Sequence, residues 1–381
     1  MAYFDNAATT FPKPECIYKA MDQLYRSIGG SVGRGNYSLS LSAKGLIDET
    51  RNLLRTLLHC PARQVIFEPT ATIALNIIIQ GLIQGGAKRI YISPFEHNAV
   101  TRTLYHFQSL GLIEVHQLAV STNLSYDFTR IRYQFESVNP DLIIMSHASN
   151  VIGLISPAEK VFTLAKKYNA TTVLDMSQTA GLVNSNLSQD IFDFAVFAGH
   201  KTLLGPTGIS GFIMKPDIKL PSVFFGGTGY DSANPNMPNS LPERFEFGTL
   251  NISGIAGLNA SIKWILSTGT STLYSEEVKN RNRLLDLLSR YDFISIIGNE
   301  PNQNYVGIVS CLLADISSDT AGQLFNDRNI AVRTGLHCAP LAHKFLGTFP
   351  AGTIRFSVNH FTSSADFDEL QAALDDIEKS L

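Results

Sequence analysis

The alternation of short apolar runs with helix-length segments constrains the fold of this chain more than any other feature. Runs rich in Val, Ile and Phe recur through residues 64–214, and helix-length segments separate most of them. Such strands, joined by helices, are typical of parallel sheets buried on both faces. We therefore predict an α/β protein with a mostly parallel seven-stranded sheet. The predicted strands are Gln64–Phe67, Arg89–Ser93, Ile113–Ala119, Leu142–Ser146, Thr171–Asp175, Phe194–Ala198 and Ser210–Met214, and the predicted helices are Ser42–Cys60, Ala71–Gln84, Asn98–Leu110, Thr129–Ser137 and Pro157–Tyr168.

After Pro216 the pattern changes, which indicates a second structural unit. Residues 225–244 are rich in Gly, Asn and Pro and predict a long irregular loop. A chain of 381 residues is long for one hydrophobic core. We expect a large domain at 15–255 and a smaller α/β domain formed by 1–14 and 256–381. The elements predicted beyond the loop are helices Ile252–Ser267, Ser275–Arg290, Ser318–Asp327 and Ala365–Ser380 and strands Tyr305–Leu312, Ile330–Thr334 and Thr353–Asn359.

Charge and apolar pattern argue against two classes of partner. The formal net charge is −3, so the chain has no basic surplus to neutralise a nucleic acid backbone. No signal-peptide pattern opens the sequence, and its most apolar segments are too short and too interrupted to span a bilayer. We expect a soluble cytoplasmic protein without nucleic acid or membrane partners.

The four cysteines form no CxxC pair and no cluster with histidines, so we expect no metal site. Cys16, Cys60 and Cys311 lie in apolar patterns and are predicted to be buried packing residues. Cys338 lies beside a glycine turn, where it is either a small buried residue or a reactive thiol.

Polar side chains follow several of the predicted strands. In open α/β sheets, ligands bind beyond the carboxyl ends of the strands. A carboxylate at such an end, like Asp175, serves as a helix cap, metal ligand or cofactor partner, and a lysine there, like Lys201, is usually solvated. We expect the functional site among the polar segments Glu68–Thr72, Glu96–His97, His147–Asn150, Asp175–Gln178 and His200–Lys201.

Taken together, Asp175 and Lys201 resemble the paired Asp and Lys of fold-type I pyridoxal-phosphate enzymes. Further motifs resemble those of class V aminotransferases, in the family's order along nearly the whole chain. The chain is most similar to cysteine desulfurases and selenocysteine lyases, as a divergent bacterial branch related to the SUF-type enzymes. The motifs are YFDNAATT (Tyr3–Thr10), GRGNYSLS (Gly33–Ser40), FEPTATIALN (Phe67–Asn76), EHNAV (Glu96–Val100), SHASNVIG (Ser146–Gly153), DMSQTAG (Asp175–Gly181), AGHK (Ala198–Lys201), RFEFGTLN (Arg244–Asn251) and RTGLHCAP (Arg333–Pro340).

This resemblance implies a role for each matching residue around the cofactor ring. Lys201 is expected to hold pyridoxal phosphate as a Schiff base, and Asp175 to keep the pyridine nitrogen protonated so that the ring accepts electrons. His97 is expected to stack on the ring and to serve in acid–base steps. Gln178 is expected to hydrogen-bond the phenolic oxygen, with Asn150 beside it.

The resemblance also places the phosphate, the substrate and a second subunit. The Ala71 N–H and Thr72 are expected to bind the phosphate at a helix N-terminus, where unpaired N–H groups favour anions, with His200 adding a contact. Thr249 resembles a residue that reaches the phosphate of a neighbouring subunit, which implies a homodimer with shared active sites. Arg355 matches the arginine that binds the substrate carboxylate, and the planar guanidinium suits that group.

Cys338 determines the reaction that the resemblance implies. Desulfurases of the family carry a cysteine in RxGHHCA, and this chain has RTGLHCA. The Cys338 thiolate is expected to take sulfur or selenium from cysteine or selenocysteine, leaving alanine and a persulfide for a protein acceptor. Arg333, expected on the substrate side with Asn150 and Arg355, and His337 are expected to favour the thiolate.

Three departures from the family pattern keep other functions open. Ala198 replaces a hydroxyl residue that donates to the phosphate, unless water or Thr202 compensates, and Leu336 replaces a second histidine. Prolines in residues 226–244 argue against a regular hairpin. The alternatives are a class V C–S lyase, transaminase or epimerase without a persulfide, or a non-catalytic scaffold or sulfur-relay protein. The sequence does not separate sulfur from selenium substrates.

Overall fold

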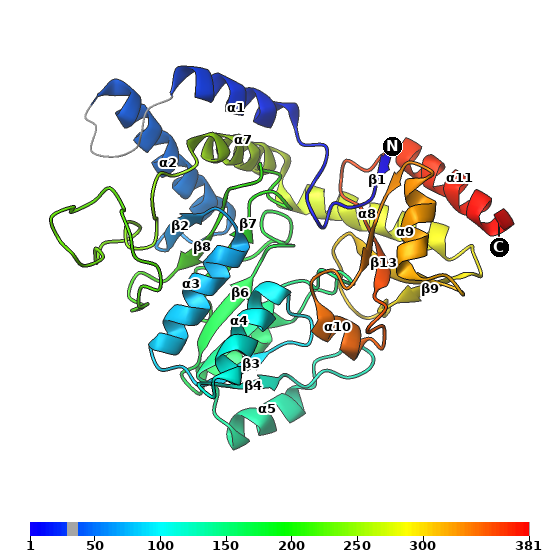
Figure 1. The fold of residues 1–381 in the computed structure, drawn as a ribbon, viewed down its shortest axis with the longest axis horizontal. Coiled ribbons are helices and arrows are strands. Elements are labelled where there is room, and N and C mark those ends of the chain that lie inside the picture. The colour runs from blue at the N-terminus through cyan, green and yellow to red at the C-terminus, as the bar shows by residue number, and fades with distance from the viewer. Residues whose placement is uncertain (29–36, 381) are drawn as a thin grey trace.

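The structure is a computed structural model that describes residues 1–28 and 37–380, so Gly33–Asn36 of one family-like motif lie outside the described residues. Its centre is a seven-stranded sheet in the order β2-β8-β7-β6-β5-β3-β4 (Figure 1). Only β8 runs antiparallel to its neighbours. The mostly parallel sheet and all seven strands are therefore confirmed, within two residues at either end. The strands are β2 (Gln64–Glu68), β3 (Arg89–Ile92), β4 (Glu114–Gln117), β5 (Leu142–Ser146), β6 (Thr171–Asp175), β7 (Phe194–Ala198) and β8 (Ser210–Met214).

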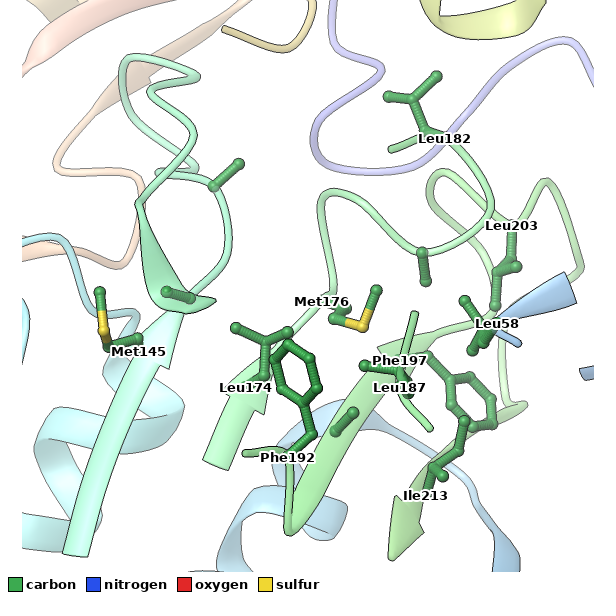
Figure 2. Close-up of a cluster of buried hydrophobic side chains, with 14 of the residues drawn as sticks. Leu58, Met145, Leu174, Met176, Leu182, Leu187, Phe192, Phe197, Leu203 and Ile213 are labelled. Atoms are coloured by element: carbon green, nitrogen blue, oxygen red, sulfur yellow. The ribbon is translucent and has the colours of Figure 1, made fainter. Parts of the chain in front are cut away.

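Helices cover both faces of this sheet because successive strand side chains point to opposite sides. Leu174, Phe197 and Ile213 enter the larger apolar cluster, shown in Figure 2, which packs against α2, α6 and α7. Their neighbours Val173 and Val196 enter the cluster beneath α3 and α4. The helices of this region are α1 (Glu15–Ser27), α2 (Ser38–Leu57), α3 (Ala71–Gln84), α4 (Asn98–Ser109), α5 (Phe128–Ser137), α6 (Ala158–Lys166) and α7 (Ile252–Thr268).

The C-terminal region contains a smaller antiparallel sheet of four strands, in the order β12-β13-β10-β9. The N-terminus belongs to the same region, since Ala2 pairs with Ile330 in a separate parallel two-stranded sheet, and both chain ends lie on this side (Figure 1). The proposed boundary after residue 255 falls inside α7 and stays a proposal. The remaining elements are β1 (Ala2–Tyr3), α8 (Thr270–Leu288), β9 (Ile294–Ile297), β10 (Ile308–Leu313), α9 (Ser318–Asn326), β11 (Ile330–Ala331), β12 (Arg333–Gly335), α10 (Pro340–Phe345), β13 (Thr353–Ser357) and α11 (Ser364–Ser380).

Several local predictions were wrong. Cys16 is exposed, because α1 turns the adjacent Ile17 to the core, whereas Cys60 and Cys311 are buried as predicted. The strand expected at 330–334 is split between β11 and β12, which belong to different sheets. Helix α8 begins five residues earlier than predicted because Gly269, at φ +88°, is the only residue between α7 and α8. The elements β1, β9, α1 and α10 were not predicted.

The long loop after β8 is irregular as predicted, with no helix or strand in residues 215–251. A buried ion pair fixes its far end. Arg51 Nη2 on α2 donates to both Glu246 carboxylate oxygens at 2.8 and 2.6 Å, with 10% and 8% of the two side chains exposed. Glu246 also accepts the Phe67 N–H of β2 at 2.8 Å. The pair therefore ties the loop to the edge of the main sheet.

We expect Glu246→Ala to lower the free energy of unfolding by about 3 kcal/mol, because it removes the buried partner of Arg51 and leaves only the exposed Asp48 carboxylate, 3.2 Å from Nη1, to pair with its charge. Chemical denaturation followed by circular dichroism measures this loss. Asp22→Ala is the matched control, since it breaks an exposed Arg26–Asp22 pair at 2.9 Å and is expected to cost less than about 0.5 kcal/mol. Equal losses in the two variants would show that the buried pair does not anchor the loop.

Candidate active site

The polar segments after the parallel strands converge on one cavity of about 260 Å³ at the carboxyl edge of the main sheet. This is slightly below the volume of roughly 300–1,000 Å³ typical of small-molecule sites. Eleven of the residues that border it are polar or lie at the start of α3: Thr70, Ala71, Thr72, His97, Ser146, Asn150, Asp175, Ser177, Gln178, His200 and Lys201. The structure thus brings the polar segments after the strands together at one cavity, and the functional role of that cavity stays a prediction.

Lys201 follows β7 in a tight turn whose backbone is held from two sides. The Gly199 N–H donates to the Ile209 carbonyl at 3.1 Å, and a Cβ on Gly199 would lie 2.2 Å from that oxygen. The turn therefore requires glycine. From the N-terminal segment, the Thr10 hydroxyl donates to the Lys201 carbonyl at 2.9 Å. This contact could not be predicted from the sequence, since no local pattern connects two residues so far apart in the chain.

The surroundings of Lys201 favour its neutral amine. Burial lowers the pKa of Lys201 from 10.5 to about 8; the negative charge of Asp175 opposes this shift, while the positive charges of Arg355 and Arg333 add to it. A lysine with this pKa is partly unprotonated near neutral pH and can act as a nucleophile or a proton acceptor.

Asp175 ends β6 with 7% of its surface exposed. Its Oδ1 accepts the Ser177 N–H at 2.9 Å and the Ser177 hydroxyl at 2.5 Å, which fixes the carboxylate against the turn that follows. Gln178 continues this turn, and its Nε2 donates to the Ala7 carbonyl at 3.0 Å. A fixed carboxylate on the cavity wall suits a protonated ring nitrogen as its partner.

His97 caps helix α4 and is held as a neutral ring. Its Nδ1 accepts the Ala99 N–H at 3.0 Å, so any ring proton lies on Nε2. Burial, and next the charge of Lys201, lower the pKa of His97 to about 4. A neutral ring on the cavity wall suits stacking on a flat ligand more than the acceptance of a proton.

The start of α3 forms the anion-binding end of the cavity. Thr70 caps the helix by accepting the Ile73 N–H, and the next two residues, Ala71 and Thr72, border the cavity at the positive end of the helix. His200 adds a buried Nδ1 without a partner in the described chain. Ala198 offers no hydroxyl here.

Thr202 does not replace the hydroxyl that Ala198 lacks. Its Oγ1 donates to the Ala180 carbonyl at 2.8 Å, and the residue does not border the cavity. The expectation that Thr202 compensates is therefore not supported, and the phosphate end of the cavity depends on the helix N-terminus and His200.

Cys338 is an exposed thiol on a strained turn, so the packing-residue interpretation is wrong. Both His337 and Cys338 have positive φ, +47° and +57°. The turn is held by Asn150 Nδ2, which donates to the His337 carbonyl at 2.6 Å, and by the Asn98 N–H, which donates to the Cys338 carbonyl at 2.7 Å. Its backbone is thus fixed between β5 and the start of α4.

Of the two residues expected to favour the thiolate, only Arg333 supplies a charge. Its Nη2 lies 3.9 Å from the Cys338 sulfur. Burial lowers the pKa of His337 to about 2, and its Nε2 lies 3.0 Å from the Thr353 hydroxyl. His337 is therefore neutral and supplies no positive charge to the Cys338 thiolate.

Arg355 lies deeply buried on β13, with 1% of its surface exposed. Its Nη1 donates to the Asn150 carbonyl at 2.8 Å and its Nη2 to Asp5 Oδ1 at 2.9 Å. Its Nε has no partner among the described residues. Asp5 was missed as a functional residue because its partner lies 350 positions away. Thr249 is exposed and does not border the cavity.

Comparison with known proteins identifies the family. The family model described as aminotransferase class V matches residues 2–370. The chain belongs to the class V aminotransferase family. This membership makes it an enzyme of the pyridoxal-phosphate-dependent class, and the donor set of the cavity fits that cofactor: an amine, a buried carboxylate, a neutral ring and an anion-binding helix end.

Curated relatives and solved structures agree with this family. The chain is 28% identical to a probable cysteine desulfurase of Methanothermobacter thermautotrophicus, over 98% of this chain and 94% of the relative. It is 28% identical to a probable cysteine desulfurase of Pyrococcus abyssi, over 100% and 94%. The apo cysteine desulfurase of Thermococcus onnurineus NA1 superposes with a TM-score of 0.85 at 26% identity, covering 100% of this chain and 95% of that one.

A NifS-like protein of Rickettsia africae, at 21% identity, shares the fold with a TM-score of 0.84 over 100% and 99% of the two chains. These matches confirm the fold class. Within the described residues, no helix is long and apolar enough to cross a membrane, and no cluster of metal-ligating side chains occurs there.

Proposed function

We propose that this enzyme is a cysteine desulfurase, which converts L-cysteine to L-alanine and leaves the sulfur on Cys338. The observation that carries the proposal is the exposed Cys338 thiol, which has the Arg333 charge beside it. Cys338 shares a pocket with His97 and Thr72, two residues that also border the cavity containing Lys201, and Asn150 of that cavity holds the neighbouring His337 carbonyl. The names of the two archaeal relatives support it. Selenocysteine, which differs from cysteine in one atom, is proposed as a second substrate.

The cavity residues would hold pyridoxal phosphate as the family resemblance implies. Lys201 would bind its aldehyde carbon, Asp175 its ring nitrogen and Gln178 its phenolic oxygen, with His97 against the ring. Ala71, Thr72 and His200 would hold the phosphate. When bound, the cofactor supplies an electron sink for the pair released when the substrate loses its Cα proton.

The remaining residues bind the substrate and move protons. Arg355, fixed by Asp5 and Asn150, keeps its Nε free for the substrate carboxylate. Lys201 accepts the Cα proton, because its pKa near 8 suits a general base, whereas His97, at about 4, does not. The acid–base role expected for His97 stays a prediction.

Cys338 carries out the sulfur transfer. Its thiolate attacks the substrate sulfur, so that a sulfur–sulfur bond forms and the Cβ–S bond breaks. The electron pair of the broken bond stays with Cβ, which takes up a proton to become the methyl group of alanine. The Arg333 guanidinium stabilises the thiolate before the attack.

A homodimer with shared active sites and a cytoplasmic location are proposed with this function. Thr249 is exposed at the end of the long loop, where it is free to reach the phosphate site of a second subunit. A sulfur acceptor completes the catalytic cycle.

A single turnover with L-cysteine tests the proposed function. We expect one equivalent of alanine per active site and a persulfide that alkylation traps on the peptide containing Cys338. Pyruvate with ammonia, and no trapped persulfide, would contradict the proposal and identify a C–S lyase.

The pKa of Lys201 gives a separate test on the cofactor-free chain. Because burial lowers this pKa from 10.5 to about 8, the neutral amine grows about tenfold per pH unit up to pH 8 and then levels off. Labelling of Lys201 with a small amine reagent, measured by peptide mass mapping, should be half-maximal near pH 8. Exposed Lys379 in the same digests is the internal comparison. A midpoint for Lys201 above pH 10 would show that its amine is not desolvated.

A further inference from the structure

A groove of about 720 Å³ opens on the outer side of Cys338, separate from the cavity that contains Lys201. It lies between α4, the edge strand β4 and the segment leading into α10, which lie side by side in Figure 1. Cys338 also borders a second pocket, with His97 and Thr72, on the side of the Lys201 cavity, and the proposed function uses only that side. Because the thiol borders this groove, a second reactant can approach it without entering the Lys201 cavity.

The walls of the groove combine apolar and polar side chains, and its charged side chains have one sign. Leu104, Leu336 and Leu341 contribute apolar surface, and exposed Tyr105 adds an aromatic side chain. Arg102 and Arg333 are the charged residues on its walls, and no Asp or Glu of residues 1–28 or 37–380 lines it.

The two arginines are available to a ligand. Neither Arg102 nor Arg333 lies within ion-pair distance of a carboxylate in the described part of the chain. Arg102 is exposed on α4, one turn beyond Asn98, whose N–H holds the Cys338 carbonyl. Arg333 Nη2 lies 3.9 Å from the thiol and Arg102 borders the same groove, so positive charge without a carboxylate partner among the described residues lies beside Cys338.

We propose that this groove binds a low-molecular-weight anionic thiol, which removes the sulfur from Cys338. The proposal rests on the proposed function, since it requires the Cys338 persulfide. The volume falls within the roughly 300–1,000 Å³ of small-molecule sites, and the two guanidinium groups complement a carboxylate on the thiol.

The transfer balances without an oxidant or a reductant. The acceptor thiolate attacks the outer sulfur of the Cys338 persulfide, so a new sulfur–sulfur bond forms on the acceptor. The bond between Cys338 and the outer sulfur breaks, and its electron pair leaves with Cys338 as the thiolate. The outer sulfur keeps its proton, the acceptor leaves as a persulfide, and Cys338 is ready for another substrate.

The test compares three thiols of different charge on the holoenzyme: 3-mercaptopropionate, 2-mercaptoethanol and cysteamine. The enzyme is first loaded by one turnover with L-cysteine, and loss of the Cys338 persulfide is then followed by mass spectrometry. In Arg102→Ala, unloading by mercaptopropionate is expected to slow about fivefold, the size of one partly exposed charge interaction. The unloading rate with mercaptoethanol should change little, and the rate with cysteamine should stay the same or rise. Since each thiol is compared with itself in two enzymes, its intrinsic reactivity cancels.

Arg290→Ala is the matched control, because it removes the same charge from an exposed position at the end of α8 and should leave all three rates unchanged. Equal slowing of the three thiols in Arg102→Ala, or no slowing at all, would overturn the proposal. The proposal would also be overturned if no small thiol removed the sulfur from Cys338 and only an added acceptor protein did so. The amount of alanine formed during loading measures the first half-reaction. If the proposed function is wrong, no alanine and no Cys338 persulfide form at this step, and this outcome differs from a failure of the groove proposal.

Discussion

Cys338→Ala is expected to lower alanine formation from L-cysteine by at least about a thousandfold, since removing the nucleophile of a covalent mechanism typically has an effect of this size or larger. No other thiol can replace it. Cys60 and Cys311 are buried, and Cys16 lies on α1. Alanine release under steady-state conditions, with an added thiol as acceptor, measures the loss.

The fold and the cofactor should survive this change, because Cys338 is exposed and its turn is held through the backbone. We therefore expect an unchanged absorbance spectrum of the holoenzyme. Cys16→Ala, which removes another exposed thiol, is the control and should keep full activity. Retention of wild-type alanine formation in Cys338→Ala would mean that the sulfur does not pass through this residue.

Most of the main sheet and the location of the site could be predicted from the sequence because both depend on local patterns. Buried parallel strands are apolar on both faces, so β5, β6 and β7 stand out as continuous apolar runs. Their carboxyl ends must meet at one edge, and this places Asp175 and Lys201 in one cavity before any distance is known. The family resemblance then gave each side chain an expected role.

The contacts that orient those side chains could not be predicted, because they join distant parts of the chain. Asp5 pairs with Arg355, and Thr10 binds the Lys201 carbonyl, through tertiary packing that no local pattern reports. The neutral state of His337 depends on burial beside Thr353. Cys16 shows the converse error, since an apolar neighbourhood along the sequence did not identify which face of α1 is buried.

Lys201→Ala is expected to abolish the pyridoxyl adduct that borohydride fixes on this residue and to lower alanine formation by at least about a thousandfold. Two losses combine in this variant. The chain loses the amine that attaches the cofactor, and it loses the proton acceptor for the substrate Cα, whose removal alone typically costs ~10²–10⁴-fold. Borohydride reduction followed by peptide mapping, together with a steady-state alanine assay, measures both.

Rescue of Lys201→Ala by an added amine distinguishes the chemical role of the lysine amine from the role of the side chain in filling space. A short primary amine such as propylamine fits the volume that Lys201→Ala vacates, so it should restore part of the activity, and the restored rate should rise with pH as the free amine loses its proton. Lys263→Ala, which removes an exposed lysine paired with Glu49 at 2.8 Å, should keep both the adduct and the rate. A borohydride-fixed adduct on another lysine of the wild-type chain would refute the role of Lys201. The base assigned to the Cα proton would then have to be sought elsewhere on the cavity wall, where His97, at a pKa of about 4, is a far weaker acceptor.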